Sequence, residues 1–145
     1  MPATPMKMTI DRLNEHRTAV LLLQDAKAIL ASMQAQMLKA MEYTGMPHAP
    51  DPSRSTENLA ILLDDQLADV NRLEAIVAES EKEVKAFVDS IEDNRTKVIF
   101  SLRFLCGMKW DDVALTIGGG NASSTMRAVC TRYLEICNTV QHSRS

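Results

Sequence analysis

The polar and basic side chains best suited to chemistry lie near the end of the chain, in the segment SSTMRAVCTRYLEIC. The spacing of its apolar residues predicts a helix with an inner face made by Met126, Val129, Cys130, Tyr133, Leu134 and Cys137. Seven residues are left on the outer face: Ser123, Ser124, Thr125, Arg127, Ala128, Thr131 and Arg132. Arginine binds guanine edges, whereas serine, lysine and backbone N–H groups bind phosphates. Together with Lys109, these residues predict a DNA-binding surface.

Two shorter helical segments precede this helix and would position it. NRTKVIFSLRFL is expected to bury Val98, Ile99, Leu102 and Leu105, and WDDVALTI is expected to bury Trp110, Val113, Ala114 and Ile117. Gly107 is expected to end the first segment. The triple glycine at 118–120 follows a helix and lacks the lysine of a P-loop, so it predicts a turn instead of a phosphate cradle. Helix, turn and polar helix are the parts of a helix-turn-helix reader.

The pattern LRFLxGMKWDDVAxxIGGGNxSSTMRAVxxRYLE resembles region 4 of bacterial sigma factors. It is more similar to phage-encoded, sigma-region-4-like transcription regulators of the late-gene activator type. The resemblance is carried by Leu102 to Leu105, Gly107, Trp110 to Ala114, and Arg132 to Leu134. It implies that Ser124 to Thr131 enter the major groove and that an N-terminal helical hairpin accompanies the reader. Lys109 departs from the serine or threonine cap usual in that family, and the turn from Gly118 is slightly longer.

The front of the chain predicts two long helices, over residues 9–43 and 56–91. The apolar stripe of the first contains Leu13, Val20, Leu23, Leu30, Met37 and Met41, broadened by Leu22, Ile29 and Met33. The second has a coiled-coil seam at Leu59, Leu63, Gln66, Val70, Leu73, Val77, Ser80, Val84, Phe87 and Ile91. Their similar lengths favour an antiparallel helical hairpin. A parallel dimeric zipper of the second helix is the alternative.

Charge separates the chain into two parts that we predict to be domains. Residues 1–92 carry nine Lys/Arg and fifteen Asp/Glu, a net charge of −6, whereas residues 93–145 carry seven and four, a net charge of +3. Only the second part suits a polyanion. We therefore expect an all-α protein with a hairpin for oligomerisation or partner docking at 1–92 and a helix-turn-helix DNA-binding domain at 93–145.

Several classes of function are disfavoured by the residues present. No histidine or cysteine accompanies the paired acids Asp64-Asp65 and Asp111-Asp112, so we expect no enzyme. Isolated histidines and three cysteines without a CxxC pair predict no metal and no cofactor. No apolar run reaches a membrane span and the N-terminus lacks a signal-peptide core, so a cytoplasmic protein is expected.

The prediction from sequence is a sequence-specific transcription regulator of phage or prophage genes. Its expected partners are double-stranded DNA, host RNA polymerase and a second copy of the chain, with a dimer favoured. Two rivals stay open. One is a small terminase subunit, which also joins a helix-turn-helix to coiled helices. The other is a polymerase-binding module that does not contact DNA.

Overall fold

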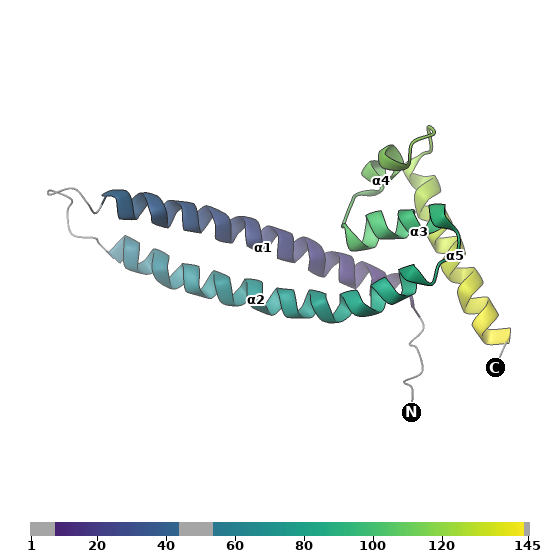
Figure 1. The fold of residues 1–145 in the computed structure, drawn as a ribbon, viewed down its shortest axis with the longest axis horizontal. Helices are drawn as coiled ribbons and strands as arrows, with labels where there is room; N and C mark the ends of the chain where they lie inside the picture. The colour runs from purple at the N-terminus through teal and green to yellow at the C-terminus, as the bar shows by residue number, and fades with distance from the viewer. Residues whose placement is uncertain (1–7, 44–53, 144–145) are drawn as a thin grey trace, which may run out of the picture. The chain divides into compact units, whose positions relative to one another are not determined.

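All of the secondary structure in the part of the chain that the structure describes, residues 8–43 and 54–143, is helical (Figure 1). In this computed structural model the elements are α1 (Ile10–Tyr43), α2 (Arg54–Asp89), α3 (Asn94–Phe100), the π-helical turn η1 (Ser101–Leu105), α4 (Trp110–Ile117) and α5 (Ser123–Ser143). The all-α prediction is confirmed. None of these helices is long and apolar enough to cross a membrane.

Packing divides the chain into two compact units. Unit 1 contains Met1–Val20 and Ala78–Ser145, and unit 2 contains Leu21–Val77. The start of α1 and the end of α2 therefore belong to unit 1 together with α3, η1, α4 and α5, while the rest of both long helices forms unit 2.

Within unit 2, α1 and α2 pack along one seam. Ala26 is buried with Val70 and Leu73, and Leu23 and Leu30 pack against them. The Gln66 amide donates a hydrogen bond to the Ala26 carbonyl at 3.0 Å. Every position of the seam predicted over residues 56–91 is buried or half-buried, with Leu59 to Val77 in unit 2, Ser80 to Phe87 in the part of α2 within unit 1, and Ile91 just after α2: Leu59, Leu63, Gln66, Val70, Leu73, Val77, Ser80, Val84, Phe87 and Ile91. The heptad pattern thus identified the packed face of this helix.

The stripe predicted for α1 was too broad. Leu22 and Ile29 are 52% and 45% exposed, and Met41 is exposed as well. His16 and Ala26, which the prediction omitted, are buried. Adding residues to one flank of a helical stripe widens it beyond what a single neighbouring helix covers, so these leucine and isoleucine side chains face outward.

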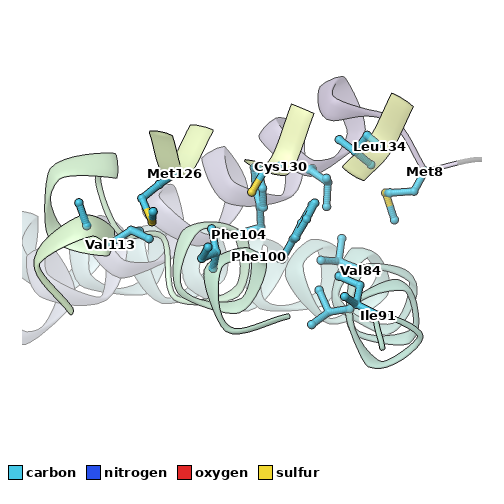
Figure 2. Packing of buried hydrophobic residues seen from close by; sticks show 13 residues of the cluster. Met8, Val84, Ile91, Phe100, Phe104, Val113, Met126, Cys130 and Leu134 are labelled. Carbon is cyan, nitrogen blue, oxygen red and sulfur yellow. The ribbon is translucent and has the colours of Figure 1, made fainter. Parts of the chain in front are cut away.

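The core of unit 1 joins residues from distant parts of the sequence (Figure 2). Its buried members come from the start of α1, the end of α2 and the C-terminal helices: Met8, Leu13, Val84, Val88, Ile91, Ile99, Phe100, Phe104, Val113, Ala114, Met126, Cys130 and Leu134. The ring of Phe100 lies 5.6 Å from that of Phe87 and 5.7 Å from that of Tyr133, both in edge-to-face geometry. The C-terminal helices are therefore held in place by the ends of the long helices.

A π-helical turn changes which side chains of the first short helix reach this core. The Cys106 N–H donates to the Ser101 carbonyl, five residues earlier, at 3.0 Å. Phe100 and Phe104 are fully buried, whereas Leu102 and Leu105 are only half-buried. The prediction based on a continuous α-helix omitted both aromatic rings. Phe100 ends α3 before the π turn, and the smaller angle per residue of the π turn then sets Phe104 in the core in place of Leu105.

His16 is a buried polar residue in unit 1 and gives the fold a pH dependence. It is 2% exposed, its Nδ1 lies 2.5 Å from the Ser80 hydroxyl, and its buried Nε2 has no hydrogen-bond partner among the described residues. Burial lowers the pKa of His16 in the folded chain, and the nearby charge of Glu81 opposes this shift only in part.

We predict that the protein loses stability as the pH falls from neutral through 6.5, the ordinary value for histidine. The unfolded chain takes up the proton first because its histidine has the higher pKa, so acid favours unfolding. The free energy of unfolding should decrease more in the wild type than in His16→Gln between about pH 7.5 and pH 5.5. Equal decreases in urea denaturation of the two proteins would contradict this assignment.

Candidate nucleic-acid interface

The exposed face of α5 carries the residues that the sequence predicted for DNA contact. Six of the seven are exposed and are spaced by three and four positions, so they share one face: Ser124, Thr125, Arg127, Ala128, Thr131 and Arg132. Ser123, the first residue of the helix, is half-buried. Hydroxyl and guanidinium donors therefore stand together around the small side chain of Ala128, which leaves room for a close approach of a partner surface.

The opposite face of α5 fixes its orientation in unit 1. Met126 and Cys130 are fully buried, and Leu134 is 5% exposed. α4 packs against α5 through its own buried residues, Val113 and Ala114. Burial raises the pKa of Cys130 to about 12, so this thiol is a neutral core side chain at physiological pH. The exposed hydroxyl and guanidinium groups of α5 therefore lie on a helix whose opposite face is packed in the core.

Three glycines redirect the chain between α4 and α5. Gly118, Gly119 and Gly120 have φ values of 78°, 77° and 70°, in the left-handed region that side-chain-bearing residues rarely adopt. The Asn121 side-chain amide donates to the Gly118 carbonyl at 3.1 Å and closes the turn. The prediction of a turn at the triple glycine is confirmed.

Lys109 lies at the other end of α4, in the N-cap position. Its backbone is extended (φ −69°, ψ 152°), and its side chain makes no capping hydrogen bond. The side chain is exposed. An ammonium group only donates and cannot cap a helix N-terminus, and its exposure lets it meet a charged partner in solvent.

Two arginines hold the turn that precedes Lys109. Arg17, in α1, donates through Nη2 to the Gly107 carbonyl at 3.2 Å. Arg103, in η1, donates through Nη1 to the Met108 carbonyl at 2.9 Å, and its guanidinium carbon lies 4.5 Å from the centre of the Trp110 ring. These contacts mean that two arginine side chains hold the backbone of the Gly107-Met108 turn in place.

Arg17 and Arg103 form an arginine cluster with Arg127 of α5. Burial lowers the pKa of Arg103, and the charges of Arg17 and Arg127 lower it further, while the Cys130 thiol acts in the opposite direction. The buried Nε atoms of Arg17 and Arg103 have no hydrogen-bond partner among the described residues. Two guanidinium charges that both act on Arg103 favour an anion nearby, and Arg127 also belongs to the exposed face of α5.

Sequence reasoning missed two members of the arginine cluster. Arg17 lies about ninety residues before the turn that it contacts, and no local pattern could have joined the two. Arg103 was part of the motif that carried the resemblance, but no role was given to it. One signal in the sequence did point to Arg103: a basic residue near a predicted helix C-terminus can hydrogen-bond to the last carbonyl groups of that helix.

Acidic residues limit the surface that suits DNA. Glu135 is exposed on α5 one turn beyond Arg132, and Asp111 and Asp112 are exposed in the first turn of α4. Carboxylates repel phosphate groups. The part of α5 best suited to a polyanion is therefore residues 124–132.

Metal ligation has no candidate in the described ranges, where no three His, Cys, Asp or Glu side chains are grouped closely enough to hold an ion. Comparison with known proteins assigns no family or function to the chain. Neither a family model, nor a curated protein, nor a solved structure matches the chain.

Proposed function

We propose that the protein is a sequence-specific, double-stranded-DNA-binding regulator of phage or prophage transcription, in which α4, the glycine turn and α5 act as a helix-turn-helix. In this proposal the first turns of α5 enter the major groove. The long helices act as an antiparallel hairpin that serves for oligomerisation or for contact with host RNA polymerase.

The observation that carries the proposal is the exposed face of α5 beside the arginine cluster. Arg127 belongs to both: it is exposed where base edges would be read, and its charge acts on Arg103. Small polar residues fill the rest of the face. Arg17 and Arg103 are half-buried and hold the turn before α4, so they add positive charge beside Arg127 that favours a polyanion at this face.

Basic residues at the edges of this face should contribute to affinity without reading sequence. We expect Lys109→Ala and Arg132→Ala each to weaken binding to all duplexes by a similar factor. Each variant should also reduce the slope of log affinity against log salt by about one unit, because one fewer counterion is released. Fluorescence anisotropy on two unrelated duplexes over a salt series measures both quantities.

Lys85→Ala provides the matched control, because Lys85 is an exposed lysine on α2 in the same unit. Its salt slope should equal that of the wild type. A wild-type protein with no affinity for any duplex at low salt would contradict the proposal and favour the polymerase-binding module. Slopes unchanged by both Lys109→Ala and Arg132→Ala would place the phosphate contacts elsewhere.

A further inference from the structure

The exposed face of α5 has a central line and two edges. Ser124, Ala128 and Thr131 are spaced by four and three positions and are all exposed, so they lie along one line. At about 100° per residue, Arg127 lies on one edge of this line and Arg132 on the other. The packed face of α5 is on the opposite side of the helix (Figure 2). The central line is therefore the part of α5 nearest to a partner that contacts the whole exposed face.

Thr131 uses its hydroxyl group within the helix. Its Oγ1 donates a hydrogen bond to the Arg127 carbonyl, four residues earlier, at 3.1 Å. A hydroxyl group has one hydrogen to donate, so this bond leaves Thr131 without a donor for a base. The side chain is exposed, and its branched Cβ carries a methyl group beside the engaged hydroxyl. Thr131 therefore offers a partner an apolar methyl group and no hydrogen-bond donor.

Ala128 extends this apolar character along the central line. Its side chain is a single methyl group, three positions before Thr131. Residues three apart on a helix are neighbours, with about 5–6 Å between their Cβ atoms. The centre of an otherwise polar and basic face is thus a pair of methyl groups.

We propose that the methyl groups of Ala128 and Thr131 bind the 5-methyl group of a thymine, which makes Thr131 a specificity-determining residue for the DNA site. In the major groove the 5-methyl group distinguishes thymine from the other bases, and alanine and threonine methyl groups form apolar contacts with it. Arg127 lies one turn before Thr131, about 6 Å along the helix, which corresponds to about two base-pair steps. The recognised site should therefore place a thymine close to the guanine bound by Arg127.

This inference rests on the proposed function, because it names a base that the reader recognises. The two can nevertheless fail separately. A protein can select a DNA sequence without any contact to a thymine methyl group, so selective binding alone does not establish the contact.

Removal of single methyl groups from either partner tests the contact. In a duplex enriched by the wild type, each thymine is replaced in turn by uracil, which lacks only the 5-methyl group. We expect one replacement to weaken wild-type binding by about three- to fivefold, as for the loss of one buried methyl group. Fluorescence anisotropy at constant salt measures the affinities.

Two variants of Thr131 separate its methyl group from its hydroxyl. Thr131→Ser keeps the hydroxyl and removes the methyl group, so it should bind the thymine duplex more weakly and lose most of the difference between thymine and uracil. Thr131→Val removes the hydroxyl and keeps a methyl group, so it should retain the preference for thymine.

Thr139→Ser is the matched control. Thr139 is exposed further along α5, and its Oγ1 donates a hydrogen bond of the same kind, to the Glu135 carbonyl at 2.8 Å. This variant should bind both duplexes like the wild type.

The possible failures are distinct. Enrichment of no duplex would refute the proposed function and this inference with it. A wild type that selects its site but binds every uracil duplex as tightly as the thymine duplex would overturn this inference alone. So would a Thr131→Ser protein that keeps the preference for thymine. A Thr131→Val protein that loses the preference would also overturn it, because the hydroxyl would then be the group that reads the base.

Discussion

Phe104→Ala is expected to lower the free energy of unfolding of unit 1 by about 3–5 kcal/mol, the range for removal of a buried phenyl ring. Phe104 is fully buried. Its ring centre lies 5.8 Å from that of Phe100 and 6.2 Å from that of Trp110. The substitution leaves a cavity between η1 and the start of α4, where neighbouring helices are fixed by their own core contacts and cannot fill the space.

Trp110 is the only tryptophan in the chain, so its fluorescence during urea denaturation reports on unit 1 specifically. Leu115→Ala removes an apolar side chain of α4 that is 80% exposed, and should change stability by no more than about 0.5 kcal/mol. Similar losses in Phe104→Ala and Leu115→Ala would contradict the placement of Phe104 in the core.

Arg127→Ala is expected to cost about 1–3 kcal/mol at one base position and to relax the sequence preference there. Arg127 is exposed near the start of α5, the part of the helix proposed to enter the major groove, and an arginine can make two hydrogen bonds to one guanine. Its loss should therefore affect some duplexes much more than others, unlike the uniform weakening expected from Lys109→Ala. Selection from a randomised duplex library with both proteins measures the preference at each position.

Arg72→Ala is the matched control for Arg127→Ala. Arg72 is an exposed arginine of α2 in unit 2, where it pairs with Asp69 at 3.2 Å. Its variant should retain the preference of the wild type at every position. An Arg127→Ala protein with an unchanged preference would remove Arg127 from the reading role, whatever its total affinity.

The helices that could be predicted from the sequence are those whose spacing alone determines the packed face. The α2 seam and the inward side of α5 were predicted in this way, because a strict alternation of three and four positions selects one face of a helix. The packed face of α1 could not be predicted as well. Leu22 and Ile29 fit a broadened apolar stripe, but they face outward, and one sequence cannot show which of two apolar faces meets the neighbouring helix.

The features that could not be predicted from the sequence depend on an irregular helical turn and on contacts between residues far apart in the chain. The π turn at Ser101–Leu105 has no signature in the apolar pattern of the sequence, and it sets Phe104 in the core beside Phe100 of α3, in place of Leu105. The arginine cluster depends on Arg17, which comes from the start of α1. The exposure of the predicted face of α5 is confirmed, while the DNA-contacting roles of its residues stay predictions.

Capture of fragmented DNA from the source genome at about 0.15 M salt, near physiological ionic strength, measures whether the protein selects particular DNA sequences. The wild type and Arg127→Ala should be run in parallel. We predict that the wild type enriches one or a few sites and that Arg127→Ala loses this enrichment. Enrichment of no site by either protein would contradict a sequence-specific reader and would favour a protein-interaction role for the whole chain.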